Sequence, residues 1–285
     1  MVSFLTASIH GSILRYKVAT LLMALGLPCL LVGQQQLYNT MIIKQFYEAM
    51  QQGQVDKVSE LIDDAYIGHN PNLDGTKASI LAVAMQNAKN KENSGKIDMV
   101  RIIEVDDFVV VHSKKEFGVN AMASFDLFKL RNGKILEHWD AYQKWEDQTA
   151  NGNTQVDGPT IPSDLNRTEA NKALVREFLE NPKGGPELYI SSAKYIQHSP
   201  FTENGLDGML RAFEKFEKEG IGFELIKIHH LLGHGNFVIV HTEGKVGGKP
   251  SIFFDIFRLE NLKIVEHWDV IDTLPENITN PNGVF

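Results

Sequence analysis

Residues 125–140 read FDLFKLRNGKILEHWD, and the chain repeats this stretch as FDIFRLENLKIVEHWD at residues 254–269. The two copies lie 129 residues apart and are identical at 11 of 16 positions. The same spacing carries YIGHNP at residues 66–71 onto YIQHSP at residues 195–200. A period this long indicates a duplicated domain, because the units of a solenoid run to about 20 to 50 residues.

The repeat divides the chain into two copies of one domain. With 285 residues, the chain is long enough for two domains of ordinary size. We expect the first copy over residues 38–146 and the second over residues 166–285. The segment between them, residues 147–165, is rich in Asn, Gly, Pro, Thr and Gln and poor in apolar residues, which is typical of a linker.

The first 33 residues have the composition of an export signal. They contain no Asp or Glu, carry Arg15 and Lys17, and then run apolar from Val18 to Val32. This pattern predicts a secretory signal peptide over residues 1–33, because a membrane span needs about 20 apolar residues. An uncleaved anchor or a misassigned start codon is the alternative. We therefore expect a periplasmic or secreted protein that has no membrane segment once the signal is removed.

Charge and cysteine content exclude several classes of function. The net charge is -8 and the basic residues form no cluster, so we expect no nucleic-acid partner. The single cysteine, Cys29, would leave with the signal. A mature chain without cysteine has no disulfides, thiol nucleophiles or cysteine-ligated zinc.

Each copy is predicted to begin with helices and to end with antiparallel strands. Apolar residues recur at helical spacing where each copy opens, namely at Ile42, Ile43, Phe46, Tyr47 and Met50, and at Leu174, Val175, Phe178 and Leu179. Four strands are expected near residues 97–104, 108–112, 123–130 and 134–142, with counterparts over residues 222–270. Helices followed by an antiparallel sheet predict the α+β class.

The turn before the last strand differs between the copies. Asn132-Gly133 is a strong signal for a two-residue hairpin, whose residues adopt positive φ. The second copy has Asn261-Leu262 in its place. Because leucine is disfavoured at positive φ, we expect the second turn to be remodelled.

The motifs together resemble a known family. Tyr-Ile-x-His-x-Pro, Phe-Asp-x-Phe and Lys-Ile-x-Glu-His-Trp-Asp, in this order in both copies, are similar to the SnoaL-like branch of the nuclear transport factor 2-like superfamily. The resemblance implies tandem conical half-barrels, each a bent antiparallel sheet wrapped around about three helices and a deep pocket. It also implies a choice of functions, because this superfamily includes polyketide cyclases, ketosteroid isomerase, scytalone dehydratase and limonene epoxide hydrolase, as well as non-enzymes. Function must therefore be argued from the site.

The Glu-His-Trp-Asp segment carries the candidate catalytic residues. Side chains alternate across a strand, so His138 and Asp140 share one face, as do His267 and Asp269 in the second copy. The family resemblance implies that the Asp is the acid or base. A carboxylate made basic by burial, with a nearby donor for the enolate oxygen, is suited to proton abstraction next to a carbonyl.

Further residues are predicted to complete each site. His69 and His198 are the candidate donors for the enolate oxygen, so they join the predicted catalytic set. The residues predicted to line the pockets and bind ligand are His112, His241, Tyr66, Tyr195, Asp126 and Asp255. Asp126 and Asp255 lie between phenylalanines, where a buried Asp is also suited to hydrogen-bond His138 or His267.

Each of these residues also has a structural interpretation. Glu-His-Trp-Asp fits a packed strand end, with Trp139 in a core or an interface and Asp140 accepting backbone hydrogen bonds. His69 and His198 fit loop histidines that bond a backbone carbonyl before the following turn.

The spacing of the histidines and carboxylates favours neither a metal nor a cofactor. No helical ligand pair such as His-Glu-x-x-His is present, and His112 and His138 are 26 residues apart. Phosphate-binding glycine loops and nucleophile elbows are also missing from the sequence.

The leading hypothesis is an exported protein whose two pockets bind a small, mostly apolar molecule. It would isomerise, cyclise or dehydrate this molecule by proton transfer. The alternative is an exported module that binds a ligand or mediates assembly without catalysis. Because related single domains dimerise through their sheets, we expect either a pseudo-dimer within one chain or a homodimer.

Overall fold

The computed structural model describes residues 38–90, 95–180 and 185–285 of the chain. Residues 1–33, where the export signal is predicted, lie outside this described part. Within it, no helix is both long and apolar enough to cross a membrane.

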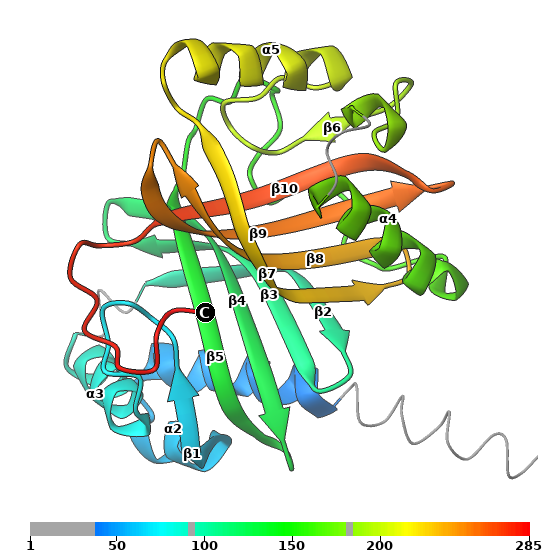
Figure 1. Cartoon of the computed structure of the whole chain (residues 1–285). Helices are drawn as coiled ribbons and strands as arrows, with labels where there is room; N and C mark the ends of the chain where they lie inside the picture. Colours follow the sequence, from blue (N-terminus) through cyan, green and yellow to red (C-terminus); the bar gives the residue numbers. More distant parts are fainter. Residues whose placement is uncertain (1–37, 91–94, 181–184) are drawn as a thin grey trace, which may run out of the picture.

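The first half of the chain forms helices and a five-stranded sheet (Figure 1). Its elements are a helix over residues 38–52, α2 (Val55–Leu61), β1 (Ile62–Gly68), α3 (Lys77–Lys89), β2 (Lys96–Val105), β3 (Phe108–Phe117), β4 (Asn120–Arg131) and β5 (Lys134–Lys144). The sheet order is β1-β5-β4-β3-β2. Strand β1 runs parallel to β5, and the other neighbours are antiparallel.

The second half repeats this arrangement. Its elements are η2 (Leu165–Arg167), α4 (Thr168–Glu180), η4 (Pro186–Leu188), β6 (Ile196–Gln197), α5 (Leu206–Lys218), β7 (Phe223–His234), β8 (Phe237–Val246), β9 (Lys249–Glu260) and β10 (Lys263–Thr273). The sheet order, β6-β10-β9-β8-β7, is that of the first sheet. The predicted α+β class, with two bent sheets and their helices in tandem, is confirmed.

Each sheet has one strand that the sequence analysis does not predict. The residues that lead up to the expected loop histidines His69 and His198 form β1 in the first half and the two-residue strand β6 in the second. Both strands pair in parallel with the last strand of their sheet. This pairing is what holds the histidine that follows each strand next to Glu-His-Trp-Asp.

The expected remodelling of the second hairpin turn is wrong. Asn132 and Gly133 have φ values of 52° and 75°, and Asn261 and Leu262 have nearly the same values, 51° and 56°. The flanking strands fix the turn geometry, so Leu262 adopts the left-handed conformation that the sequence disfavours.

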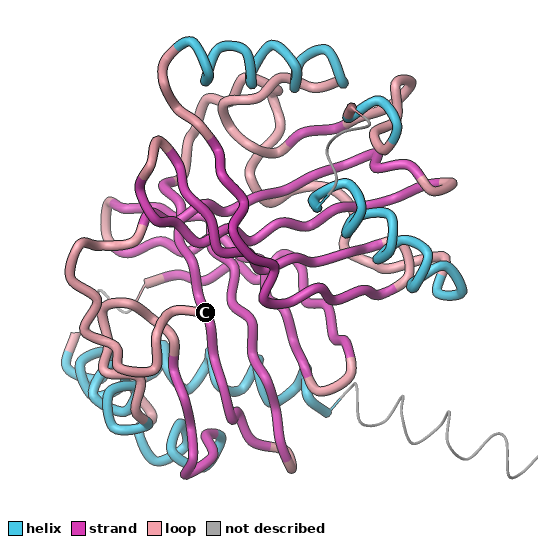
Figure 2. Tube along the Cα trace, in the orientation of Figure 1, coloured by secondary structure: helices cyan, strands magenta, loops and turns pink. Residues whose placement is uncertain are grey.

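The two sheets pack against each other and the helices lie outside them, as Figure 2 shows. In each half the opening helix covers the concave face of its own sheet. Phe46 contacts Phe128 with ring centroids 5.8 Å apart, and Phe178 contacts Phe257 at 6.0 Å. The concave faces are therefore closed by helices, and the opposite faces form one core shared by both halves.

Four aromatic rings form the centre of this shared core. His112 stacks on Phe125 and His241 stacks on Phe254, each with centroids 4.2 Å apart. Phe125 in turn stacks on Phe254 at 5.8 Å, across the boundary between the sheets. The four residues are related by the 129-residue repeat, so the contact joins equivalent positions of the two halves.

The segment that follows each sheet crosses to the other half of the molecule. After β5, the Asn151 side chain donates to the carbonyls of Ser199 and Thr202, at 2.8 and 2.9 Å. After β10, the Asn280 side chain donates to the carbonyls of Gly68 and Asn70, both at 2.9 Å. The segment between the two halves is thus docked along its length by specific hydrogen bonds.

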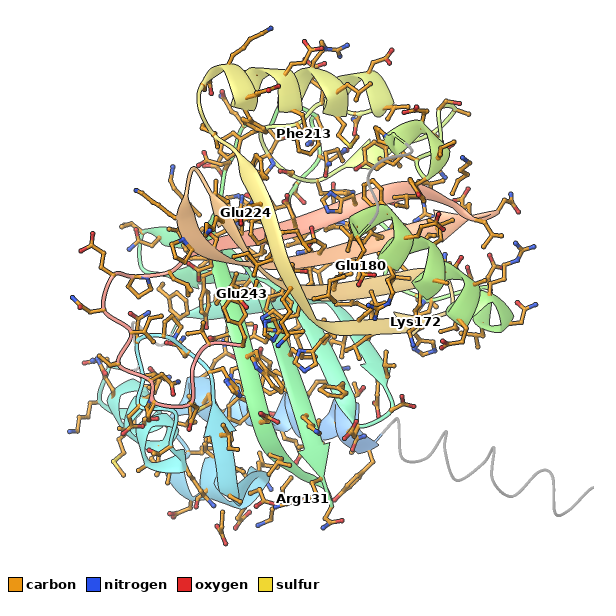
Figure 3. The ribbon with its side chains drawn as sticks, viewed as in Figure 1. Arg131, Lys172, Glu180, Phe213, Glu224 and Glu243 are labelled. Carbon is orange, nitrogen blue, oxygen red and sulfur yellow. The ribbon has the colours of Figure 1, made fainter. Side chains whose placement is uncertain are left out.

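Helix α5 contacts its sheet through a few aromatic residues. The rings of Phe213 and Phe216 lie 6.1 and 5.4 Å from the ring of Phe223, where β7 begins (Figure 3). Phe213 is nevertheless 51% exposed, and Leu225 in β7 is 41% exposed. The rim of the second half is therefore apolar and open to solvent.

Replacing the strained leucine should stabilise the protein. Leu262 is 40% exposed and has a φ of 56°, so Leu262→Gly removes backbone strain at little cost in buried surface. We expect the free energy of unfolding to rise by about 1 kcal/mol in chemical denaturation. The matched control, Gly133→Ala, should destabilise, because a Cβ atom there would lie 2.9 Å from Tyr38. A loss of stability in Leu262→Gly would contradict this account of the turn.

Candidate functional site

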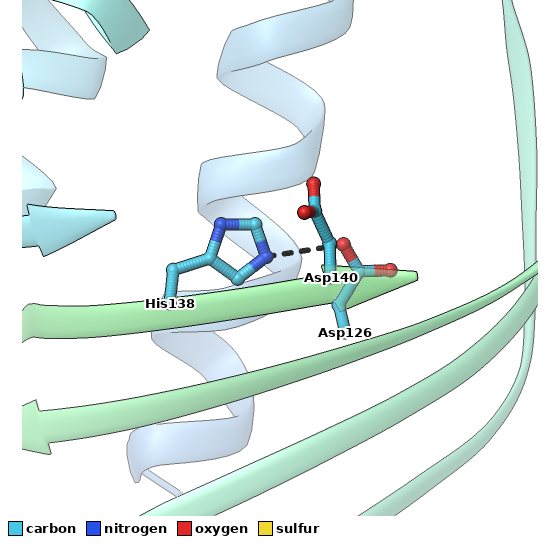
Figure 4. A group of neighbouring side chains, drawn as sticks. All are labelled: Asp126, His138 and Asp140. Carbon is cyan, nitrogen blue, oxygen red and sulfur yellow. Dashed lines mark hydrogen bonds and ion pairs between the residues drawn. The ribbon is translucent and has the colours of Figure 1, made fainter. Parts of the chain in front are cut away.

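In the first half, the predicted histidine and aspartate face the helix-covered side of the sheet. Asp126 on β4 and Asp140 on β5 are direct neighbours across the ladder, and His138 lies beside them (Figure 4). His138 Nε2 is 3.1 Å from Asp126 Oδ1. The structure thus brings together three of the residues that the sequence predicts.

A buried lysine neutralises Asp126. The Lys115 ammonium donates to both carboxylate oxygens, at 3.0 and 2.8 Å, and Lys115 is only 3% exposed. Burial raises the pKa of Asp126, but the charge of Lys115 and the hydrogen bond from His138 outweigh burial and hold this pKa below its usual range. Asp126 therefore stays ionised in its ion pair.

Asp140 is held by side chains other than histidine. The Asn70 amide donates to its two oxygens at 3.0 and 2.9 Å, and the Tyr142 hydroxyl donates at 2.9 Å. Burial, together with the negative charges of Asp140 and Asp126, raises the pKa of the Tyr142 hydroxyl. Tyr142 therefore stays a neutral donor, and each Asp140 oxygen already has a hydrogen bond.

Two tyrosine hydroxyls border the same interior. Those of Tyr47 and Tyr66 are buried and have no hydrogen-bond partner among the described residues. Burial is the main cause that raises the pKa of both groups, and Asp126 and Asp140 contribute. Tyr66 thus borders the interior, as the sequence predicts for a ligand-binding residue.

The second half has the same histidine-aspartate pair without a lysine. His267 Nε2 is 3.0 Å from Asp255 Oδ1, and its Nδ1 is 3.1 Å from Gln197 Oε1. Burial alone would lower the pKa of His267, but the hydrogen bond and charge of Asp255 raise it. Tyr195 borders this interior and accepts a hydrogen bond from the Gln197 amide at 3.2 Å.

Asp269 differs from its counterpart Asp140 in having a free oxygen. It is 8% exposed, and its Oδ1 has no hydrogen-bond partner in the described part of the chain. Burial, which His267 opposes and Asp255 reinforces, raises the pKa of Asp269 to about 6. A buried carboxylate with a free lone pair and a raised pKa is suited to act as a general base.

His69 and His198 lie on the other side of the sheets from these aspartates. Nε2 of His69 is 3.0 Å from Glu137, and Nε2 of His198 is 3.0 Å from Glu266. Each ring stacks on the tryptophan of the Glu-His-Trp-Asp segment in its own half. Their Nδ1 atoms contact the carbonyls of Gly283 and Thr154, at 3.2 and 2.8 Å. The expected donation to a substrate held by Asp140 or Asp269 has no support in this geometry, which matches the structural interpretation instead.

His112 and His241 lie between the two sheets and reach neither interior. Arg101 Nη1 lies 2.7 Å from Nδ1 of His112, and Nδ1 of His230 lies 3.1 Å from Nδ1 of His241. Burial, with these neighbours, lowers the pKa of both histidines. They are neutral parts of the shared core, so their predicted role in lining the cavities is wrong.

Lys115 was not among the predicted site residues, although its face of the sheet follows from alternation. Lys115 stands in the charged run Lys114-Lys115-Glu116, which indicates an exposed strand end. Alternation from the buried Val111, however, puts residue 115 on the inward face. Asn70 was missed because it lies 70 residues from Asp140 in sequence. Tyr142 lies two residues from Asp140 on the same strand, and alternation places both side chains on one face.

The first half contains one group with the geometry of metal ligands. Ligand atoms of Asp126, His138 and Asp140 lie within 4.8 Å of one another. The Lys115 ammonium already contacts both oxygens of Asp126. The positive charge that a metal ion would supply is thus provided by a side chain.

Two surface hollows lie away from both sites. One of about 490 Å³ lies between α4 and the turn that joins β9 to β10, and Leu174, Leu188 and Leu262 line it. A second, of about 320 Å³, occupies the corresponding place in the first half, beside Ile42 and Gly133.

Comparisons with known proteins find likenesses among solved structures. No protein-family model and no curated protein matches the chain. The solved structures that are similar to it include nuclear transport factor 2-like proteins. One, from Cytophaga hutchinsonii and of unknown function, is 10% identical and aligns 37% of this chain with 89% of its own, at a TM-score of 0.32.

Two further neighbours have names that mention an activity. The polyketide cyclase candidate IdmH from Streptomyces antibioticus is 19% identical, and 37% of this chain aligns with 91% of it at a TM-score of 0.31. An LEH-like epoxide hydrolase from M. tuberculosis is 14% identical, and 38% of this chain aligns with 85% of it at a TM-score of 0.32.

Removing the buried lysine should destabilise the first half. Lys115→Met leaves the Asp126 carboxylate buried without its counter-ion, so we expect unfolding to become easier by about 3 kcal/mol or more. Adding Asp126→Asn to Lys115→Met should recover most of the lost free energy of unfolding, because no unpaired charge is then buried. Urea denaturation of the two single variants and the double variant measures the coupling. Additive effects would contradict a direct ion pair.

Asp269 should make stability depend on pH. Its pKa is about 6 in the folded chain and near 4 when unfolded, so the folded state binds the extra proton. Stability is then full below about pH 4 and falls as pH rises through 6. At pH 7.5, Asp269→Asn should therefore be more stable than the parent, by at most about 3 kcal/mol.

The control separates this effect from that of a second buried carboxylate. Burial also raises the pKa of Asp272 to about 6, and Asp272 accepts from the Tyr142 amide where the two halves meet. Asp272→Asn should change the pH dependence by its own increment, independently of Asp269→Asn. A stability difference between Asp269→Asn and the parent that is equal at pH 4 and pH 7.5 would refute the raised pKa.

Proposed function

We propose that the protein binds a small, mostly apolar carbonyl compound and transfers a proton next to its carbonyl group. The observation that carries this proposal is Asp269, a buried carboxylate with a free oxygen beside a histidine. A pKa of about 6 leaves Asp269 ionised at neutral pH and still basic enough to accept a proton.

The reaction begins with transfer of a proton from carbon to Asp269. The electron pair of the broken C–H bond moves toward the carbonyl, which becomes an enol or enolate. The Tyr195 hydroxyl accepts a hydrogen bond from Gln197 and keeps its own proton to donate to the substrate oxygen. Burial raises the pKa of Tyr195, so this donor stays neutral.

The second step returns the proton and decides the product. Protonated Asp269 gives its proton to another carbon in an isomerisation, or to a leaving hydroxyl in a dehydration. His267 stays bound to Asp255 and holds positive charge near Asp269, which favours the carboxylate form. The apolar, exposed rim formed by α5 and the beginning of β7 supports an apolar substrate.

A binding module without catalysis is the second candidate. One observation favours it, namely that the larger hollow, of about 490 Å³, is lined mostly by apolar residues of α4 and η4 rather than by the aspartates. A protein of this kind would hold an apolar ligand and carry out no proton transfer.

A model carbon acid tests the proposal without knowledge of the natural substrate. A nitrobenzisoxazole loses its ring C–H proton to a base while its N–O bond breaks, which releases a coloured nitrophenolate. We expect the parent protein to exceed acetate in solution by about 100-fold, with a pH profile whose midpoint is near 6. A folded protein that reacts no faster than acetate would favour the binding module.

A further inference from the structure

We propose that the two sites have different roles, so that the second half carries the only general base and the first half holds a structural polar core. This inference rests on the proposed function and assigns it to one of two sites that share the same aspartates and histidine. The two sites differ at positions that the 129-residue repeat makes equivalent and in the opening helices, which correspond through the contacts of Phe46 with Phe128 and of Phe178 with Phe257.

The first difference is the buried cation. Lys115 pairs with Met122 across the ladder, and Gly244 pairs with Ser251 at the equivalent place. Position 244 therefore supplies no side chain, and the second half lacks the ammonium group that Lys115 gives the first half. Asp255 consequently has His267 as its partner, without a lysine.

The space left by the lysine in the second half is filled by a phenylalanine. A Cβ atom at position 244 would lie 2.6 Å from Cε2 of Phe253, so no larger side chain fits there as the chain is folded. The equivalent of Phe253 in the first half is Ser124, whose hydroxyl donates to Asp126 at 3.3 Å. The exchange of Lys115 and Ser124 for Gly244 and Phe253 conserves volume and replaces polar groups by an aromatic ring.

The second difference concerns hydrogen bonds to the base. Asp140 receives them from Asn70 and Tyr142. The equivalent residues in the second half are Ser199, whose side chain still hydrogen-bonds Asp269, and Ile271, which has no group to donate. This loss leaves Oδ1 of Asp269 without a partner among the described residues.

A third exchange makes the second interior apolar. The opening helix places Tyr47 next to Phe46 in the first half and Leu179 next to Phe178 in the second. Leu179 packs against the apolar core of the second half, and Phe253 stands where the first half has Ser124. Ionised carboxylates are destabilised in such surroundings, and this is why the pKa of Asp269 is raised.

These differences determine which carboxylate is able to accept a proton from carbon. A base needs a free lone pair aimed at its substrate, and both oxygens of Asp140 already accept hydrogen bonds. Asp269 has the free oxygen, and its apolar neighbours Phe253 and Ile271 fit an uncharged group of the substrate. The substrate of the second site should therefore carry an apolar portion next to its acidic carbon.

The nitrobenzisoxazole reaction of the full chain tests this assignment. Because the first site is unchanged in Asp269→Asn, the activity left in this variant reports the first site directly. We expect the rate to fall by about 100-fold, to that of the solution reaction. If about half of the rate remains, both sites are bases, and the assignment is overturned while the proposed function stands.

A second variant gives Asp269 the hydrogen bonds of Asp140. Ser199→Asn with Ile271→Tyr replaces the Ser199 donor by an amide that reaches both oxygens and adds a hydroxyl donor, so we expect at least a 10-fold loss of rate and a lower midpoint in the pH profile. Circular dichroism and thermal unfolding establish that the variant is folded. The matched control, Tyr142→Phe in the first half, should leave the rate within twofold of the parent. A double variant that keeps the parent rate and midpoint would overturn the proposal.

The two proposals fail in different ways. If the parent does not accelerate the reaction, the proposed function fails, whichever site is examined. The titration of the Asp269 carboxyl in the parent and in the double variant then still decides the difference between the sites. The proposal predicts a lower midpoint in the double variant, and equal midpoints would refute it.

Discussion

The packing of the two sheets on each other is the contact on which both sites depend. It is centred on Phe125 and Phe254, whose rings stack across the boundary at 5.8 Å. Because side chains alternate along a strand, a tryptophan that faces this boundary forces the adjacent His and Asp of Glu-His-Trp-Asp to face the helices. Trp139 and Trp268 both lie at the boundary and are buried. One interface thus sets the direction of the candidate catalytic residues in both halves.

The same contact explains the two histidines that lie far from the aspartates. His69 and His198 stack on these tryptophans, bond the glutamates of the motif, and contact carbonyls of the crossing segments. Each half therefore closes the edge of the other. Breaking the sheet contact would release the tryptophan, the histidine and the crossing segment together, so their stabilisation is expected to be cooperative.

Much of the fold could be predicted from the sequence, because it depends on pattern. The repeat, the order of helices and strands, and the inward face shared by His138 and Asp140 all follow from periodicity. The strands β1 and β6 could not be predicted, since they are short and their pairing with distant strands decides them. At Leu262, too, tertiary structure outweighs local preference, because the flanking strands impose a backbone conformation that leucine disfavours.

The site could be predicted only in part. Alternation placed His138 and Asp140 on one face, and Asp126 was expected to hydrogen-bond His138, but Asn70 and Lys115 reach the aspartates from another segment and another strand. Lys115 lies in a charged run whose appearance indicates solvent exposure, although alternation from Val111 puts it on the inward face, where it is buried. The two sites share the residues that define the motifs, so the difference between them depends on variable motif positions, such as Asn70 and Ser199, and on residues outside the motifs.

The central claim is that Asp269 is a buried base with a raised pKa. Titration of the full chain by NMR, with carbon-13-labelled aspartate carboxyls and Asp269→Asn to assign the signal, measures this directly. The account predicts a midpoint near pH 6 for Asp269. A midpoint near the ordinary aspartate value of about 3.9 would contradict it and would leave no general base at this site.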